Sequence, residues 1–228
     1  MNAADDCGFR LVKSDHKDWD RYVWEHPKGA VFHSSAMVRA YAATRGIEPY
    51  TRAAIDADGK IVALLVSCYV KTLEVLAPVS SRAVQYAEPL CDPNPAGLAA
   101  LTELIRAHDE HMRSRALMCE VRAICEPGLE RDALLANGYE HRDYVNYVID
   151  LRCGVDGLWG KLDKRLRQKI RGSNRKGVVL RDDNTPEGIS RLYGLLQASY
   201  RRARIPLPDV TLFVNSLACL PQGCVRVR

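Results

Sequence analysis

The sequence predicts a mixed α/β protein, and three observations support this prediction. Short runs of branched and aromatic residues alternate with segments of helical periodicity, in the order β, α, α, β, β, β, α, β, α, β. A cationic stretch with helical spacing follows, and the same order then begins again. The composition, 47% hydrophobic and 27% charged, is that of a globular chain with a core and argues against disorder.

The first three predicted elements are a strand and two helices. Residues 9–13 alternate in polarity, as a half-buried strand does. A helix is predicted over 19–26, where a Pro-x-Gly sequence ends it. Ser34 or Ser35 can cap a second helix, which closes at Gly46.

A β-hairpin and a third strand are predicted next. The sequence from Asp56 to Gly59 predicts the hairpin turn, because Asp and Gly tolerate the positive φ angles that tight turns need. The three strands are predicted at 50–55, 61–70 and 73–76. Residues 79–91 carry turn residues and polar groups, and we expect them to be irregular.

The rest of this first region reads as helix, strand, helix and strand. A long amphipathic helix is predicted between Pro95 and Ala116, with Leu101 and Leu104 on its apolar side. After it come a buried strand at 117–123, a short helix at 129–136 and a strong strand at 144–151.

The cationic stretch combines an apolar stripe with positive charge on its other faces. The stripe repeats every fourth residue, which is the spacing of one side of a helix, and consists of Leu158, Leu162, Leu166 and Ile170. The cations are Lys161, Lys164, Arg165, Arg167, Lys169, Arg171, Arg175 and Lys176. Asp163 is the one acid among them. Gly177 suits a left-handed helix cap, and 178–181 reads as a strand.

Residues 178–228 are predicted to begin a second copy of the first fold. Helices are predicted at 186–202 and 208–220, and a strand begins at 224–227. The expected organisation is therefore a first domain at 1–154, a basic connecting helix at 155–177 and an incomplete second domain at 178–228. The repeat lies in the order of elements, not in matching residues.

The positive charge belongs to the second part of the chain. Residues 1–157 hold 18 Lys and Arg against 23 Asp and Glu, a net charge of −5, whereas 158–228 hold 15 against 5, a net charge of +10. Like charges at i,i+4, such as Arg165 and Lys169, repel each other on a helix. Three kinds of anion could compensate this positive charge: phosphate or phosphorylated lipid, nucleic acid, and an acidic face of the same fold. The fourth explanation is that the charged face of the helix is simply exposed to solvent.

The cysteines and the apolar runs predict a reduced cytoplasmic protein. The eight cysteines form no CxxC pair and no metal-ligand spacing, so we expect no metal site. His108 and His111 share a helix face, but no third ligand is spaced to join them, and both are expected at the surface. No apolar run approaches the roughly 20 residues that span a bilayer. The basic helix could still bring the protein to the inner face of the membrane.

Several segments resemble the Fem-type (FemABX) peptidyltransferases and the FemAB-like acyltransferases. The resemblance covers nearly the whole chain, and the order of the motifs gives it weight. The matching segments are GAVFHSSAMVRAYAATRGIEPY, VSSRAVQYAEPLCD, MCEVRA, LWGKLDKRLRQKIRGSNRKGVVL and LYGLLQASYRRARIPLP. Two departures are Met37, near the position of the family's usual Trp, and a Gly-Ser-Asn sequence at 172–174 that predicts fraying of the basic helix.

The resemblance implies a Gcn5-related acyltransferase fold, a mixed sheet flanked by helices. It also implies transfer of an acyl or aminoacyl group to an amine or hydroxyl of a cell-envelope precursor, such as a peptidoglycan or polysaccharide intermediate. Aminoacyl-tRNA or acyl-CoA is the implied donor, and a lipid-linked precursor is the implied acceptor. The bacterial enzyme would be inactive if the missing part of its second domain were essential.

The implied site residues fall into two sets. The acceptor groove would be bordered by His33, Ser34, Tyr86 and Glu88, of which Glu88 is a weak candidate for the catalytic base. The phosphates of a substrate would be bound by Arg165, Arg167, Lys169, Arg171, Arg202 and Arg204. The ordinary alternatives are a helix-start histidine for His33 and a core ring for Tyr86.

Two other functions remain open from the sequence. One is a coenzyme A-dependent N-acetyltransferase, although the chain contains no [RQ]xxGx[GA] pyrophosphate loop. The other is a non-enzymatic nucleic-acid-binding protein that uses the basic helix, which would lose affinity steeply with added salt.

Overall fold

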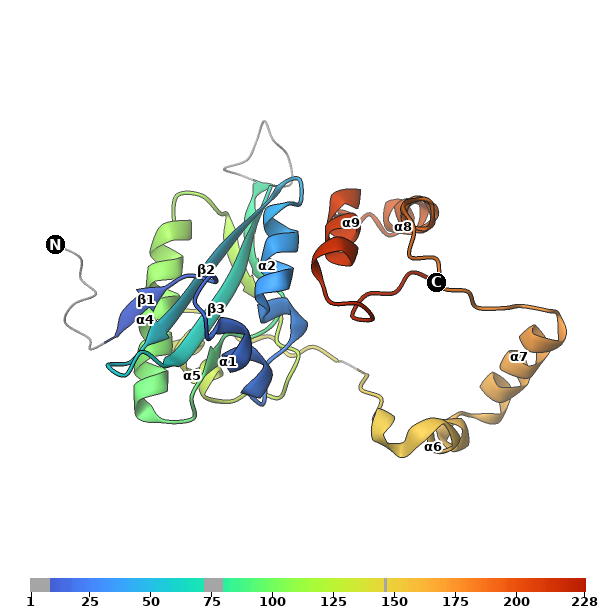
Figure 1. The fold of residues 1–228 in the computed structure, drawn as a ribbon, viewed down its shortest axis with the longest axis horizontal. Helices are drawn as coiled ribbons and strands as arrows, with labels where there is room; N and C mark the ends of the chain where they lie inside the picture. The colour runs from blue at the N-terminus through green and yellow to red at the C-terminus, as the bar shows by residue number, and fades with distance from the viewer. Residues whose placement is uncertain (1–8, 72–79, 146) are drawn as a thin grey trace. The chain divides into compact units, whose positions relative to one another are not determined.

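A computed structural model describes residues 9–71, 80–145 and 147–228. The chain forms two compact units (Figure 1). Unit 1 contains the described residues of 1–141 together with 184–227, and unit 2 contains those of 142–183 with Arg228. The sheet lies entirely in unit 1.

The sheet of unit 1 is open and mixed. Its strand order is β1 (Arg10–Val12), β2 (Ile47–Ile55), β3 (Ile61–Val70), β4 (Arg82–Gln85) and β6 (Met118–Val121), with the short β5 (Leu90–Cys91) beside β3. Neighbouring strands run antiparallel from β1 to β4. β4 and β6 pair in parallel, from Arg82 opposite Met118 to Gln85 opposite Val121. The mixed α/β class predicted from the sequence is therefore confirmed.

The β2–β3 hairpin forms where its turn residues predict it. Asp56 Oδ1 accepts hydrogen bonds from the backbone N–H groups of Asp58 at 3.0 Å and Lys60 at 2.9 Å. Gly59 has a φ angle of +78°, which a residue without a side chain adopts at little cost. This turn fixes the register in which Tyr50 lies opposite Ser67.

The segment expected to be irregular, 79–91, contains two short strands instead. β4 and β5 both pair with β3, and their residues are mostly buried. Their sequence carries turn residues and polar side chains, so their strand conformation comes from pairing with β3 and not from an alternating pattern. The strand predicted at 73–76 lies outside the described residues.

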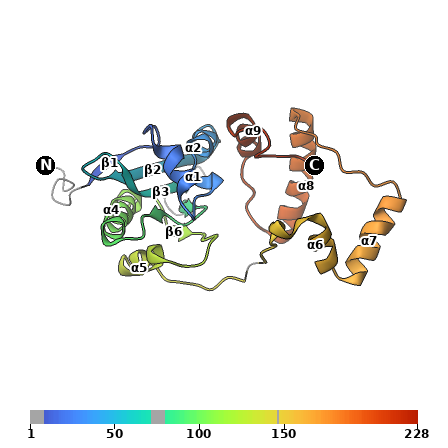
Figure 2. The same ribbon diagram turned by 60° about the horizontal axis from the view of Figure 1, so that its bottom comes forward.

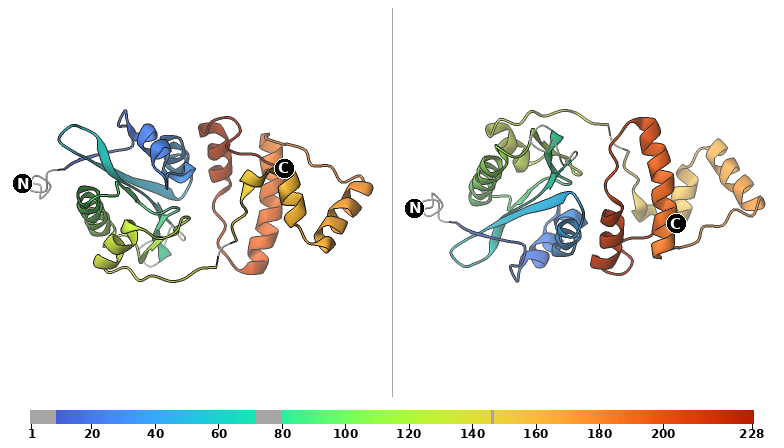
Figure 3. Two further views of the ribbon diagram at one scale, coloured as in Figure 1. Left: turned by 90° about the horizontal axis from the view of Figure 1, so that it is seen from below. Right: turned by 90° about the horizontal axis from the view of Figure 1, so that it is seen from above.

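Helices cover both faces of the sheet (Figures 2 and 3). The short helices α1 (Trp19–Glu25) and α2 (Ser35–Ala42) pack on one face, with the 3₁₀ turn η1 (Val31–His33) between them. α4 (Pro95–Met112) packs on the other face beside α5 (Leu129–Ala136). All four helices lie where the sequence predicts them.

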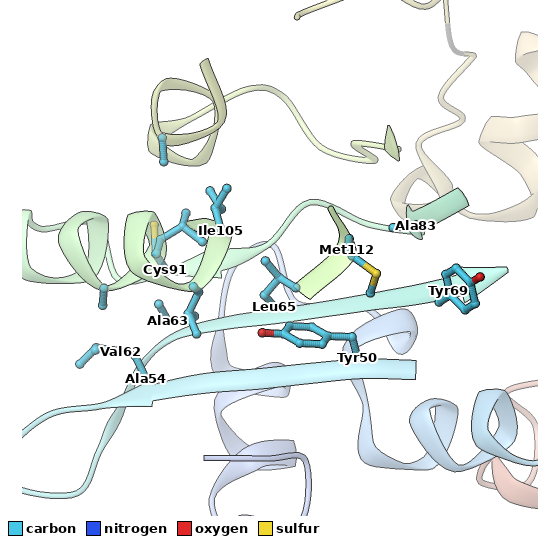
Figure 4. Packing of buried hydrophobic residues seen from close by; sticks show 14 residues of the cluster. Tyr50, Ala54, Val62, Ala63, Leu65, Tyr69, Ala83, Cys91, Ile105 and Met112 are labelled. Atoms are coloured by element: carbon cyan, nitrogen blue, oxygen red, sulfur yellow. The ribbon is translucent and has the colours of Figure 1, made fainter. Parts of the chain in front are cut away.

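Each face of the sheet carries its own apolar cluster. On the α4 side, Leu65 of β3 and Ala54 of β2 pack with Leu101, Leu104 and Ile105 (Figure 4). On the α2 side, Leu64 and Val66 of β3 pack with residues of α1 and α2. Successive residues of β3 therefore serve opposite faces, and both faces are buried, which explains why the sequence of this strand is almost continuously apolar.

Three strands predicted later in the chain are absent. Residues 144–151, apart from 146, contain no strand, and neither do 178–181 or 224–227. Tyr144, Val148 and Val179 are 87%, 87% and 69% exposed. A strand needs a neighbour to accept and donate its backbone hydrogen bonds, and no described strand pairs with these segments. Their β-branched composition alone was not enough to form strands.

Unit 2 contains the predicted basic helix as two helices. α6 (Gly154–Lys161) ends before Asp163, which caps α7 (Lys164–Arg175) by accepting a hydrogen bond from Leu166 N–H at 2.8 Å. The break therefore lies at 162–163, and residues 172–174, where fraying was predicted, remain helical. A 3₁₀ turn, η2 (Leu151–Cys153), precedes α6.

α7 ends as its sequence predicts. Gly177 has a φ angle of +74°, its N–H donates to Asn174 O, and Val178 N–H donates to Ser173 O. These two bonds define a Schellman cap.

Two further helices of unit 1 confirm predicted elements. α8 (Pro186–Ala203) and α9 (Val210–Cys219) occupy the positions of the predicted helices at 186–202 and 208–220. α9 packs against α2, and Arg45 N–H donates a hydrogen bond to Thr211 Oγ1 at 3.0 Å. Among the described residues, no helix is both long enough and apolar enough to cross a membrane.

Candidate functional site at the ends of strands β4 and β6

The candidate site lies where the parallel strands β4 and β6 end. The N–H of Arg122, the residue after β6, donates at 2.9 Å to the carbonyl of Gln85, the last residue of β4. Beyond this point Glu88, which follows β4, connects to the segment that follows β6. Its carboxylate accepts hydrogen bonds from Ile124 N–H at 2.8 Å and Cys125 N–H at 3.0 Å. In open α/β sheets, ligands bind outside the carboxyl ends of the parallel strands. β4 and β6 are neighbouring parallel strands, and the chain crosses from one to the other through α4.

Glu88 is held as a structural group in this arrangement. It is 1% exposed, and each of its carboxylate oxygens accepts one backbone N–H. Both hydrogen bonds reach the segment that follows β6, so Glu88 determines the course of that segment. A base must direct a lone pair at the proton it removes. A catalytic role for Glu88 stays a prediction.

His33 lies beneath Glu88 and is also fully hydrogen bonded. Ala30 N–H donates to His33 Nδ1 at 3.1 Å, so the ring proton sits on Nε2, which donates to Glu88 O at 2.9 Å. Trp19 Nε1–H donates to the carbonyl of His33 at 2.8 Å. Burial lowers the pKa of His33 below its ordinary value and keeps the ring neutral. His33 therefore joins η1 to the β4–β5 connection.

Ser34 caps helix α2. Its Oγ accepts the N–H of Met37 at 3.2 Å and donates to Val31 O at 2.7 Å. The residue is 2% exposed. These bonds account for both hydrogen-bonding capacities of the hydroxyl, and they give Ser34 a role in forming the helix start.

Tyr86 presents its ring between aromatic residues and a guanidinium group. The ring stacks on Tyr41 with centroids 5.7 Å apart and tilts against Phe32 at 6.4 Å. Arg122 Cζ lies 5.5 Å from the centroid of the Tyr86 ring, within cation–π range. Burial raises the pKa of Tyr86 above its ordinary value, so its hydroxyl stays protonated at neutral pH.

Arg122 is oriented by Glu120. The guanidinium donates to the carboxylate through Nε at 2.9 Å and Nη2 at 3.2 Å, and the two residues are at i and i+2. This contact lowers the pKa of Glu120 and raises that of Arg122. Arg82 Nη1 lies 3.9 Å from the same carboxylate. Two cations and one anion thus surround the exposed side of Tyr86.

The predicted phosphate-binding cations divide between the two units. Arg165, Arg167, Lys169 and Arg171 lie on α7 in unit 2, whereas Arg202 and Arg204 lie at the end of α8 in unit 1. Arg171 Cζ sits 5.5 Å from the Trp159 ring centroid. No ion pair involves the four α7 cations within the described part of the chain. The structure therefore groups His33, Ser34, Tyr86 and Glu88, but does not join them to these cations.

Sequence reasoning missed Arg122 as a member of the site. Its position over Tyr86 depends on the parallel pairing of β4 with β6, which no local pattern specifies. A surface depression lined by Phe9, Ala99 and Thr102 lies elsewhere on unit 1 and contains none of the predicted site residues.

His108 was expected at the surface, and this prediction is wrong. It is 0% exposed on the buried side of α4, where its Nδ1 hydrogen bonds with Asp109 Oδ1 at 2.8 Å. Cys119 of β6 lies nearby, so three side chains that can bind a metal converge at this place. The third ligand comes from a different element, and the spacing of residues in the sequence could not reveal it.

No protein-family model matches the chain, and no curated protein is detectably similar to it.

Proposed function

We propose that the chain is a FemAB-like acyl- or aminoacyltransferase of bacterial type. The acceptor would be an amine or hydroxyl of a cell-envelope precursor, and the donor an aminoacyl-tRNA or an acyl-CoA. The observation that carries the proposal is the sheet itself. Its elements run β, α, α, β, β, β, α, β, α, with a single parallel pair in the described chain, β4 and β6, at the end of the antiparallel series.

The order of elements supports a Gcn5-related domain in unit 1. Counting β1, α1, α2, β2, β3, β4, α4, β6 and α5, the elements follow the order that this fold shows, if the two-residue β5 is set aside. Support for a second, truncated copy is weaker. α8 and α9 keep the helices of the predicted repeat, whereas its two strands at 178–181 and 224–227 are not formed.

The chemistry at the strand ends fits acyl transfer by direct attack. Such a reaction needs an oriented acceptor and a group that stabilises the developing oxyanion, and it requires no covalent enzyme intermediate. Arg122 offers a guanidinium whose orientation Glu120 maintains, and Tyr86 offers a protonated hydroxyl. His33 is unsuited to remove the proton, because both its nitrogens already form hydrogen bonds. The acceptor amine or a bound water would supply the proton path.

A transfer assay tests the proposal. The purified chain is incubated with a lipid-linked peptidoglycan precursor and either radiolabelled aminoacyl-tRNA or radiolabelled acetyl-CoA. Label should pass to the precursor from one donor, and the productive donor distinguishes a peptidyltransferase from a CoA-dependent N-acetyltransferase.

Arg122→Gln should lower kcat/KM by about tenfold or more, as expected when a charge-assisted hydrogen bond is removed. Arg113→Ala, an exposed change on the turn after α4, is the matched control. A folded chain that transfers label from neither donor would refute the proposal.

A nucleic-acid-binding function is the second candidate, and α7 favours it. Its cations are solvent-accessible and without ion pairs among the described residues, as a phosphate-binding helix requires. Replacing Arg165 and Arg167 by Ala should weaken binding of generic RNA or DNA and reduce the salt slope, by about 0.7 to 0.9 for each phosphate that is no longer neutralised. Arg113 and Arg226, both exposed and outside α7, provide a double variant of equal charge as the control. If both double variants bind alike, α7 is not the interface.

A further inference from the structure

A partly buried polar cluster lies between helix α4 and strand β6, on the sheet face opposite Tyr86. It contains His108 and Asp109 of α4, Cys119 of β6, and Tyr139, which follows α5. Cys119 pairs with Ala83 across the β4–β6 ladder and packs against the apolar cluster beneath α4. The transferase proposal makes no use of these four residues.

The cluster supplies three donor atoms of the kinds that zinc prefers. An imidazole nitrogen, a carboxylate oxygen and a thiol sulfur lie within 4.8 Å of one another. In a tetrahedral zinc site, bonds of about 2.0 to 2.3 Å place neighbouring donors about 3.3 to 3.8 Å apart. The closest pair here, His108 Nδ1 and Asp109 Oδ1, is 2.8 Å apart. Movements of about 1 Å or less, within the range of side-chain rotation, would bring the donors to that spacing.

Neighbouring residues already orient two of the donors. Tyr139 O–H donates to Asp109 Oδ1 at 2.7 Å, which holds the carboxylate toward the cluster. The His108 ring meets the Tyr50 ring edge to face, with centroids 5.3 Å apart, and its side chain is 0% exposed. Such supporting contacts are what keep metal ligands in position.

The ion-free cluster is incompletely satisfied. His108 Nε2 is buried and has no hydrogen-bond partner among the described residues. An imidazole that is buried with one unpaired nitrogen, beside a carboxylate, gains more from a cation than a fully bonded imidazole would.

We propose that His108, Asp109 and Cys119 form a binding site for a divalent ion of the zinc type. The ion takes the lone pair of one imidazole nitrogen of His108, an oxygen of Asp109 and the thiolate of Cys119, and water completes the coordination. Cys119 releases its thiol proton to solvent, and the imidazole keeps its one proton on the nitrogen that the ion does not bind. Tyr139 keeps its proton and its hydrogen bond to the carboxylate. This site would tie α4 to β6 and is independent of the transferase activity.

Cobalt titration of the full chain tests the site. After chelator treatment and dialysis, Co²⁺ should bind at one equivalent and produce the near-ultraviolet thiolate-to-cobalt charge-transfer band, and Zn²⁺ should displace it. Cys119→Ser and Cys119→Ala should both abolish the band and weaken Zn²⁺ binding by at least about tenfold, which is the order of loss expected for a missing ligand. Tyr139→Phe should weaken binding while the band persists, since Tyr139 acts through Asp109.

Cys68→Ser is the matched control. Cys68 lies in β3 and is more deeply buried than Cys119, but it packs on the α2 face and belongs to no group of metal donors among the described residues. This variant should keep both the band and the affinity. A folded wild-type chain without a thiolate band, or a band that survives Cys119→Ser, would overturn the proposal. In the second case exposed thiols such as Cys153 and Cys224 would be the ligands.

Discussion

At the scale of single residues, the interior of unit 1 holds polar groups whose hydrogen bonds decide loop geometry. Glu88 is 1% exposed and connects two segments that leave the sheet, because its carboxylate accepts the N–H groups of Ile124 and Cys125. His33 donates to the carbonyl of the same glutamate. Buried polar groups of this kind are costly unless they are paired, so each partner depends on the others.

Glu88→Gln should destabilise the protein. A carboxamide has one acceptor oxygen, so its NH₂ group would face one of the two backbone N–H donors and leave that donor unsatisfied. We expect a loss of about 1 to 3 kcal/mol in the free energy of unfolding, measured by urea denaturation. Glu126→Gln, an exposed change nearby, should have little effect. If Glu88→Gln removed transferase activity at unchanged stability, Glu88 would be catalytic.

The buried His33 should make the folded protein less stable in mildly acidic solution. Burial lowers its pKa in the folded protein below the ordinary value of 6.5. As pH falls below about 6.5, the unfolded chain binds a proton that the folded chain does not, so the unfolding free energy decreases, by at most about 1.4 kcal/mol per pH unit. This decrease should continue down to the folded-state pKa.

Denaturation curves collected between pH 7 and pH 5 measure this effect. His33→Gln should flatten the pH dependence. His111 also has a lowered pKa, caused by burial and by Arg115 beside it, but it lies on the exposed side of α4. His111→Gln should therefore flatten the curve less than His33→Gln does. The reverse ranking would show that His33 takes up its proton without unfolding.

At the scale of elements, the helix starts follow their capping residues closely. Ser34, Asn94, Asp163 and Thr185 each accept a backbone N–H in the first turn of α2, α4, α7 and α8. Capping is a local interaction between a side chain and the next three residues, which is why it can be read from sequence. The strands outside the β2–β3 hairpin behaved differently, since each needed a partner more distant in the chain.

Ser34→Ala should destabilise α2 and the protein with it. The change removes the acceptor of Met37 N–H and the donor to Val31 O at a buried position. We expect a loss of about 1 to 2 kcal/mol in the free energy of unfolding by urea denaturation. Ser114→Ala removes an exposed hydroxyl in the turn after α4 and should be neutral. Equal effects of the two changes would mean that the cap contributes nothing.

At the scale of the whole molecule, unit 1 is assembled from two stretches of chain that are distant in sequence. α9 packs on α2, and Leu212, Cys219 and Leu220 join the apolar cluster on that face of the sheet. α8 is tied to α9 by Tyr193, whose hydroxyl donates to Pro208 O at 3.0 Å and whose ring meets Phe213. The residues of unit 2 lie between these two stretches in the chain.

Cleavage within unit 2 should therefore leave unit 1 assembled. Limited trypsin digestion at the exposed lysines and arginines of α7 should yield an N-terminal and a C-terminal fragment that co-elute in native size-exclusion chromatography. Leu212→Asp should make them separate, because it places a charge against the apolar cluster. Val214→Asp should not, since Val214 is 43% exposed on the same helix. Separate elution of the wild-type fragments would contradict the α2–α9 packing.

The features that the sequence determined by itself are those that depend on local interactions. The mixed α/β class, the Asp56–Gly59 hairpin turn, the Ser34 cap and the Gly177 termination were all readable, because each depends on neighbours within a few residues. The resemblance to FemAB-like acyltransferases also came from sequence, and it stays a prediction.

Only the tertiary structure decided which long-range pairings form. It made strands of 82–85 and 90–91 because β3 offers them partners, and left the β-branched segment 144–151 unpaired. It placed Arg122 over Tyr86 and brought Cys119 to His108, since both meetings require β6 to pair in parallel with β4. Backbone hydrogen bonds between strands join residues far apart in the chain, and no local pattern of residue types specifies the partner.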